Sequence, residues 1–141
     1  MIWVSKAKNT RGITKQKKEI MKVQNAKILS TELGFDDNGC LTFNIHLKLQ
    51  TGGQIGINSY CIGHGGSCEY YKIDTVKGTE KGMTAIARIL SVVGVDNWED
   101  LSGKFCRVRF ENDGDLSDSI DSIGNIMKES WFDFIDYFEK K

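Results

Sequence analysis

Residues 25–49 read NAKILSTELGFDDNGCLTFNIHLKL, and this stretch decides the fold. In its second half, apolar residues at 41, 43, 45, 47 and 49 alternate with polar ones, which is the period of a strand with one buried face. Residues 23–30 predict a second, weaker strand. The DDNG turn at 36–39 tolerates positive φ, so we expect the two strands to form an antiparallel hairpin. A Gly-Gly turn at 52 and 53 then leads into a third strand over 54–62.

From residue 79 to residue 93 the apolar residues follow helical spacing. Thr79 is a suitable N-cap and Gly94 a suitable C-terminal stop. A short capped turn is expected over 96–101, with Trp98 and Leu101 pointing inward. The predicted core-facing stripe of the helix consists of Met83, Ile86, Ala87, Leu90 and Val93.

The remaining sequence predicts more strands and a closing helix. Residues 104–111 alternate, with Cys106, Val108 and Phe110 on one side. A polar, acidic loop is expected over 112–121, a short strand over 122–127 and a terminal helix over 129–139. The predicted fold class is α+β: an antiparallel β-sheet with a central helix and a C-terminal helix packed on it.

Composition predicts one globular domain. The 141 residues are 40% hydrophobic and 27% charged, and their net charge is zero. Residues 1–20 form a basic extension, with six basic residues against Glu19, and termini of this kind are commonly disordered. Residues 21–141 are then a single ligand-binding domain. With no apolar run of about 20 residues and no signal region, we expect a cytoplasmic protein without membrane contact.

One group of residues has some resemblance to a metal site. Cys61, His64 and Cys68 lie close in sequence, and Cys40 or His46 would have to supply a fourth ligand. Their spacing matches no common zinc module, and the glycines around His64 are typical of a plain loop. We therefore expect reduced cysteines, no metal and no cofactor.

Two groupings favour ligand binding. Arg107 and Arg109 lie on one face of a strand about 6–7 Å apart, a separation suited to two phosphates. The alternative is a solvated strand face on which Glu111 pairs with an arginine. Asn125, Lys128, Trp131 and Phe132 form the second grouping, in which an aromatic ring could stack on a base while an amide reads its edge. The alternative there is that Trp131 and Phe132 anchor the last helix to the core.

No phosphate-binding loop, histidine metal pair or nucleophile elbow occurs in the sequence, so nothing nominates an enzyme.

The sequence resembles the phage Thoeris anti-defence family in several segments. These are Asn-Ala-Lys-Ile-x-Ser-Thr-x-Leu-Gly at 25–34, the acidic turn that follows, Leu-Thr-Phe at 41–43 and Gly-Gly-Gln at 52–54. The resemblance continues in VGVDNWEDLSGK at 93–104, IGNI at 123–126 and WF at 131–132.

This resemblance implies a non-enzymatic sponge in the cytoplasm of the infected host. Such proteins bind a cyclic ADP-ribose isomer made by a TIR-domain enzyme, and some also hold cyclic oligonucleotides. It implies a homo-oligomer, a dimer or hexamer, with Arg107 and Arg109 on phosphates and Asn125, Trp131 and Phe132 on the nucleoside. The chain departs from the family pattern over 53–60, where an aromatic is missing, and in its acidic insertion over 112–119.

Other functions remain open at this point, and an enzyme that degrades a cyclic nucleotide is the last of them. The basic extension together with Phe105, Arg107 and Arg109 could serve a phage accessory protein that binds single-stranded nucleic acid. The acidic stretch over 112–121 could instead serve an inhibitor that binds a host defence complex directly.

Overall fold

The computed structural model describes residues 23–58, 60–65, 76–111 and 119–139. The expected disorder of residues 1–20 therefore concerns residues outside the described part. The strands are β1 (Val23–Phe35), β2 (Cys40–Leu49), β3 (Gln54–Ile57), β4 (Cys61–His64), β5 (Lys77–Gly78), β6 (Phe105–Phe110), β7 (Ile120–Asn125) and β8 (Trp131–Asp133). The helices are α2 (Glu80–Val93), the 3₁₀ turn η2 (Trp98–Leu101) and α3 (Phe134–Glu139).

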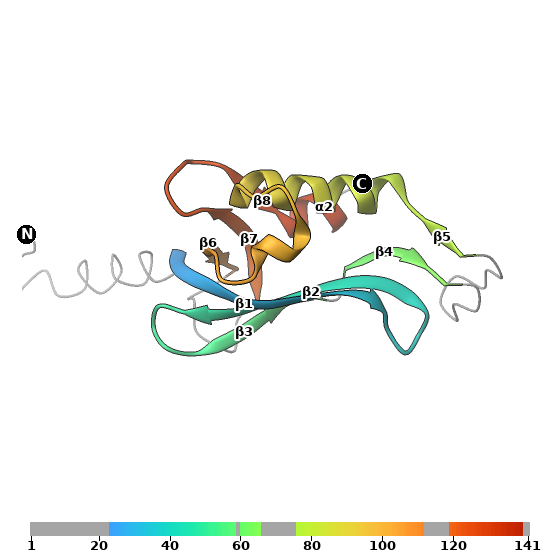
Figure 1. Ribbon diagram of the computed structural model, residues 1–141, viewed down its shortest axis with the longest axis horizontal. Helices are drawn as coiled ribbons and strands as arrows, with labels where there is room; N and C mark the ends of the chain where they lie inside the picture. The colour runs from blue at the N-terminus through green and yellow to red at the C-terminus, as the bar shows by residue number, and fades with distance from the viewer. Residues whose placement is uncertain (1–22, 59, 66–75, 112–118, 140–141) are drawn as a thin grey trace, which may run out of the picture.

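In the described part of the chain, eight antiparallel strands form one sheet in the order β5-β4-β2-β1-β6-β7-β8, with β3 pairing to the side of β2. Helix α2 packs on β4 near one end of this order and on β7 and β8 at the other. The sheet must therefore bend around the helix, and Figure 1 shows α2 above a lower layer formed by β1, β2 and β3. This arrangement confirms the α+β fold class. We call the face toward α2 the inner face and the opposite one the outer face.

The predicted hairpin is confirmed, and its first strand is longer than expected. β1 runs on to Phe35, and the turn closes through Asp36, whose backbone N–H donates to the Cys40 carbonyl at 2.8 Å. Gly39 adopts φ 84°, as the turn chemistry requires. The pairing shifts register between Ile28 and Ser30, so inward-facing residues change from even to odd numbers beyond this bulge.

The third predicted strand, 54–62, is interrupted. β3 pairs with the second half of β2, opposite residues 45–48, whereas β4 pairs with its first half, opposite residues 40–42. Both short strands therefore share one edge of β2. The continuous alternation of Ile55 and Ile57 could not show where one strand ends and the next begins.

Helix α2 has the predicted caps but a different buried face. The Thr79 side chain accepts a hydrogen bond from the Gly82 N–H at 2.9 Å, and Gly94 ends the helix at φ 96°. The predicted stripe is wrong in part, because Met83 is 70% exposed and Ala87 is also exposed. The residues that α2 buries are Gly82, Ala85, Ile89, Val92 and Val93. A Cβ at Gly82 would overlap the Ile62 backbone, so the helix approaches β4 on its smallest side chains.

The C-terminal segment differs from the predicted helix over 129–139. Trp131–Asp133 form strand β8, which pairs with β7, and only Phe134–Glu139 are helical. A strand forms here in place of a helix because burial alternates along the segment. Phe132 and Phe134 are buried in the core, whereas Trp131 and Asp133, which alternate with them, are only partly buried. β7 also begins at Ile120, inside the stretch that we expected to be a loop.

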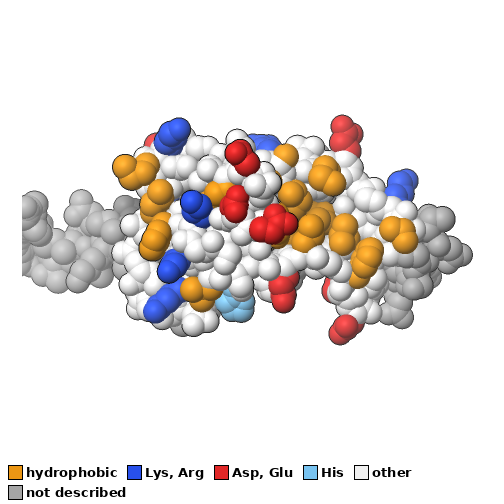
Figure 2. All heavy atoms as spheres, viewed as in Figure 1, with side chains coloured by type: hydrophobic (Ala, Val, Ile, Leu, Met, Phe, Trp, Pro, Cys, Tyr) orange, Lys and Arg blue, Asp and Glu red, His pale blue; other side chains and the backbone are white. Residues whose placement is uncertain are grey.

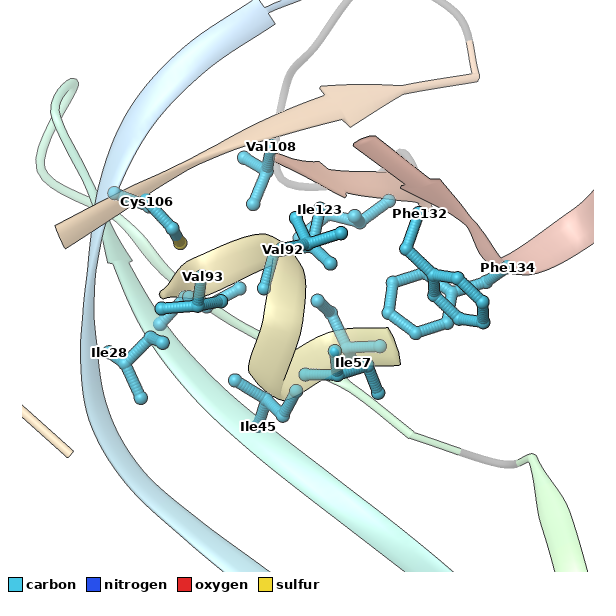
Figure 3. Close-up of a cluster of buried hydrophobic side chains, with 14 of the residues drawn as sticks. Ile28, Ile45, Ile57, Val92, Val93, Cys106, Val108, Ile123, Phe132 and Phe134 are labelled. Atoms are coloured by element: carbon cyan, nitrogen blue, oxygen red, sulfur yellow. The ribbon is translucent and has the colours of Figure 1, made fainter. Parts of the chain in front are cut away.

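The core lies between α2 and the inner face. Figure 3 shows side chains of β1, β2, β6, β7 and β8 converging on Val92 and Val93 of α2. At one end, Phe132 and Phe134 meet edge to face with ring centroids 5.1 Å apart. Burial raises the pKa of the Cys106 thiol to about 12, so this cysteine is an inert core residue.

Replacing Gly82 by alanine tests the close approach of α2 to β4. The methyl group would overlap backbone atoms of Ile62, which cannot rotate away, so Gly82→Ala should lower the free energy of unfolding by about 1–3 kcal/mol despite alanine's better helix propensity. Urea denaturation measures the change. Gly78→Ala is the matched control, because a Cβ at Gly78 has nothing within 4 Å. A Gly82→Ala variant as stable as the unaltered protein would contradict this packing.

Candidate functional site

Strands β6, β7 and β8 bring the two predicted arginines beside Trp131 on the outer face. Antiparallel pairing places Arg107, Gly124 and Trp131 in one row across the three strands. The Trp131 ring lies over Gly124, where a Cβ would stand 2.6 Å from ring carbons Cδ2 and Cε3. The guanidinium carbons of Arg107 and Arg109 lie 4.9 and 4.8 Å from the centroid of the indole. We call these three side chains the arginine–tryptophan cluster.

Arg107 is held by the loop between β7 and β8. Its Nε donates to the Asn125 carbonyl at 2.8 Å, and its Nη2 donates to the Lys128 carbonyl at 2.8 Å. Nη2 also donates to Glu129 Oε1 at 2.9 Å. With 20% of its side chain exposed, Arg107 is a largely buried and well-positioned cation.

Arg109 is fixed by β7. Its Nε donates to Asp121 Oδ1 at 3.3 Å and its Nη2 to Ser122 Oγ at 2.9 Å, with 36% of the side chain exposed. Ser122 Oγ in turn donates to Asp121 Oδ1 at 2.6 Å. Among the residues that the structure describes, Nη1 of Arg107 and Nη1 of Arg109 have no hydrogen-bond partner.

Sequence reasoning missed the two carboxylates of the cluster. The alternative to phosphate binding paired Glu111 with an arginine, but the ion-pair partners are Glu129 for Arg107 and Asp121 for Arg109. Glu129 accepts hydrogen bonds from Arg107 and also from Trp131 Nε1, at 3.3 Å, and these bonds hold its pKa below the usual range. Nothing in the linear pattern distinguishes Glu129 and Asp121 from other acidic residues, because only the strand register brings them to the arginines.

The side chain of Asn125 has a structural role. Its Nδ2 donates to the Val92 carbonyl at 2.9 Å and so supplies a hydrogen bond to a carbonyl in the last turn of α2, which has no partner within the helix. Its Oδ1 accepts the backbone N–H groups of Met127 and Lys128 at 2.8 and 2.9 Å, which fixes the β7–β8 loop. Both ends of the amide are therefore engaged within the fold. Lys128 contributes its carbonyl to Arg107, and the residue itself is exposed.

Phe132 lies on the other face of the sheet from the cluster. It is 1% exposed and packs in the core against Phe134 and Tyr137. A ligand on the outer face would not touch its ring, so the core-anchor alternative describes Phe132 better than the nucleoside contact does. Of the six predicted residues, the structure brings together the side chains of Arg107, Arg109 and Trp131 with backbone groups of Asn125 and Lys128.

An acidic hollow borders the cluster on the side of α3. It has a volume of about 430 Å³ and is lined by Glu111, Asp121, Asp133, Ile135, Asp136 and Glu139. Burial, followed by the charges of Glu139 and Glu111, raises the pKa of nearby Tyr60 to about 12. An anionic ligand would be repelled from this side of the cluster.

No family model matches this sequence, and no curated protein matches it.

Of the residues considered as metal ligands, Cys68 lies outside the described part, and Cys61 Sγ donates to the Gly63 carbonyl at 3.0 Å. The described residues contain no group of three or more His, Cys, Asp or Glu side chains placed to hold a metal ion. They also contain no helix long and apolar enough to cross a membrane.

Substituting Gly124 tests whether the indole rests on this strand. In Gly124→Ala the new methyl group would displace the Trp131 ring, so we expect a loss of about 1–3 kcal/mol in unfolding free energy and a change in tryptophan emission. Fluorescence-monitored urea unfolding records both. Gly34→Ala in β1 is the control, since a Cβ there meets nothing within 4 Å. Unchanged emission and stability in Gly124→Ala would show that Trp131 does not lie over Gly124.

Proposed function

We propose that this protein binds a phosphate-bearing signalling nucleotide of the host at the arginine–tryptophan cluster and sequesters it without degrading it. The sequence resemblance to the phage Thoeris anti-defence family suggests a cyclic ADP-ribose isomer as the ligand, with cyclic oligonucleotides as further ligands. It also suggests action as a dimer or hexamer in the host cytoplasm during infection. The observation that supports the proposal is the placement of two guanidinium groups within 5 Å of one indole centroid.

These groups suit a nucleotide chemically. The Nη1 groups of Arg107 and Arg109, which make no hydrogen bond to the described residues, can each donate to a phosphate oxygen. An indole provides a flat apolar surface on which a base can stack. Because their other nitrogens are held by β7 and the β7–β8 loop, the two arginines are positioned before any ligand arrives.

Glu129 has a specific part in this proposal. Its carboxylate is 79% exposed and accepts from Arg107 at 2.9 Å, which is a position that a phosphate oxygen of the ligand could take. Because most of its side chain is already exposed, displacing it uncovers little surface and costs little packing energy. Its negative charge nevertheless opposes an incoming anion.

Tight sequestration also favours more than one subunit. Nanomolar affinity corresponds to about −12 kcal/mol, which small-molecule sites usually achieve by enclosing their ligand. The cluster lies open on a sheet face, where Arg109 is 36% exposed. A second subunit that covers this face would enclose the nucleotide, and this is why the proposal includes a homo-oligomer.

A capture-and-release experiment tests the function. The purified full chain is mixed with cyclic ADP-ribose isomers and with cyclic di- and trinucleotides and filtered, and the retained protein is denatured by heat. Mass spectrometry of both fractions should show one nucleotide depleted from the filtrate and released with unchanged mass. A new product mass would indicate an enzyme instead. No depletion of any nucleotide would contradict the proposal.

Variants of the cluster assign the capture to this surface. Arg107→Ala or Arg109→Ala should reduce capture about tenfold or more, because each removes a charged hydrogen-bond donor. Glu129→Gln should capture at least as much as the unaltered protein, since it removes the opposing charge and keeps a similar shape. Lys77→Ala, an exposed cation on the edge strand β5, is the control. Equal capture by all four variants would place the ligand elsewhere.

A further inference from the structure

Lys27, Lys48 and Phe105 lie beside the arginine–tryptophan cluster on the outer face. Strand register places Lys27 opposite Lys48 of β2 on one side and opposite Phe105 of β6 on the other. Phe105 precedes Arg107 by two residues on β6, which corresponds to about 6–7 Å. In Figure 2, most of the Lys and Arg side chains in view lie toward the end of the molecule where β1 begins.

The two lysines differ from the two arginines in their partners. Arg107 and Arg109 form salt bridges with Glu129 and Asp121, whereas Lys27 and Lys48 form none with any residue that the structure describes. Like charges directly opposite each other on neighbouring strands destabilise a sheet. These ammonium groups have no carboxylate partner in the described part of the chain, and a bound anion would offset their charge.

A hollow of about 210 Å³ separates these side chains. The surface that lines it is almost entirely apolar, and the lining residues are Asn25, Ala26, Lys27, Lys48, Leu49, Gln50 and Phe105. Phe105 is 57% exposed, and Lys27 Nζ lies 5.8 Å from the centroid of its ring. An exposed aromatic beside cations that lack a carboxylate partner suits a planar ring that carries a phosphate, because the ring can stack while the phosphate meets the ammonium groups.

The size and position of the hollow indicate that it holds only part of a ligand. Sites for complete small molecules usually measure about 300–1,000 Å³, which is more than this hollow offers. Asn25 lines the hollow and lies opposite Arg107 in the β1–β6 pairing, so the hollow and the cluster adjoin. On the other side of the cluster, the acidic hollow repels anions. A nucleotide held at the cluster would therefore extend toward Phe105.

We propose that Lys27, Lys48 and Phe105 form a second nucleotide subsite. It binds one phosphorylated nucleoside unit of a ligand whose other unit lies on the arginine–tryptophan cluster. This inference rests on the proposed function and adds to it a ligand with two phosphate-bearing units. The three side chains belong to three strands, and their positions near the cluster are set by the pairing of β1 with both β2 and β6.

Calorimetric titration of the full chain with the dinucleotide pApA and with AMP tests this subsite. We expect pApA to bind about tenfold or more tighter than AMP, because it can occupy both subsites. Phe105→Ala should weaken pApA binding about tenfold, which is the usual effect of losing one base–aromatic stack. The double variant Lys27→Gln/Lys48→Gln should weaken it by a similar factor. Each lost contact between an exposed lysine and a phosphate costs about three- to fivefold in affinity, and the variant loses two.

Matched controls are present in the chain. Phe35→Ala removes an equally exposed ring, 56% against 57%, at the far end of β1, and Lys77→Gln neutralises an exposed lysine on β5. Both should bind pApA as the unaltered protein does. Because Phe105 is mainly exposed, its substitution should leave the urea unfolding midpoint unchanged, and this is checked for every variant.

Three results would overturn the subsite. In the first, pApA binding falls in Arg107→Ala but is unchanged in Phe105→Ala and in the double lysine variant, which leaves the proposed function intact. In the second, neither probe binds, and capture of cyclic ADP-ribose isomers then decides separately whether the proposed function fails too. In the third, affinity for oligothymidylates rises steadily from two to twelve nucleotides, which indicates a site for single-stranded nucleic acid.

Discussion

The simultaneous pairing of β1 with two neighbours is the constraint on which the rest of the structure depends. Its first residues, Val23 to Lys27, pair with β6, and residues 26–35 pair with β2 across a register shift between Ile28 and Ser30. Backbone bonds fasten this point to the segment after η2: the Ile28 N–H donates to the Lys104 carbonyl at 2.8 Å, and the Gly103 N–H donates to the Ile28 carbonyl at 2.7 Å. The bulge helps the sheet bend, so that one helix can contact both of its ends.

The same pairing determines what the outer face presents. Inward residues of β1, β2 and β6 fill the core, so their outward neighbours must lie side by side on the opposite face. Asn25 thereby meets Arg107, and Lys27 meets Phe105. The arginines are neutralised by Glu129 and Asp121, whereas the lysines have no such partner in the described part of the chain. One face thus offers both positioned and uncompensated cations beside aromatic rings, and this combination supports the proposed recognition of a nucleotide.

Local patterns predicted the elements whose signals are local. The alternation of β6, the DDNG turn and the caps of α2 follow from neighbouring residues, and the structure confirms them. The buried face of α2 did not follow, because hydrophobicity favoured Met83 whereas the helix approaches Ile62 through Gly82. Such a contact between distant segments has no signature in a helical period. β8 was missed for a related reason, since its residues look helical until β7 is available as a partner.

The candidate site shows the same division. Two arginines on one strand face and a nearby tryptophan were predictable, but Glu129, Asp121 and the Lys27–Lys48 pairing depend on register. Asn125 illustrates a further difficulty, because an amide that caps α2 and shapes a loop resembles in sequence an amide that reads a base. Residue type alone could not separate these roles.

The most direct measurement of the central claim is a nuclear magnetic resonance titration of side-chain N–H signals with the nucleotide that the protein captures. The Nε–H signals of Arg107 and Arg109 and the indole N–H of Trp131 should shift as ligand is added. The indole N–H of Trp98, whose nitrogen atom is buried, should stay in place. If the ligand saturates the protein while the Arg107, Arg109 and Trp131 signals remain unchanged, the outer face is not the binding site.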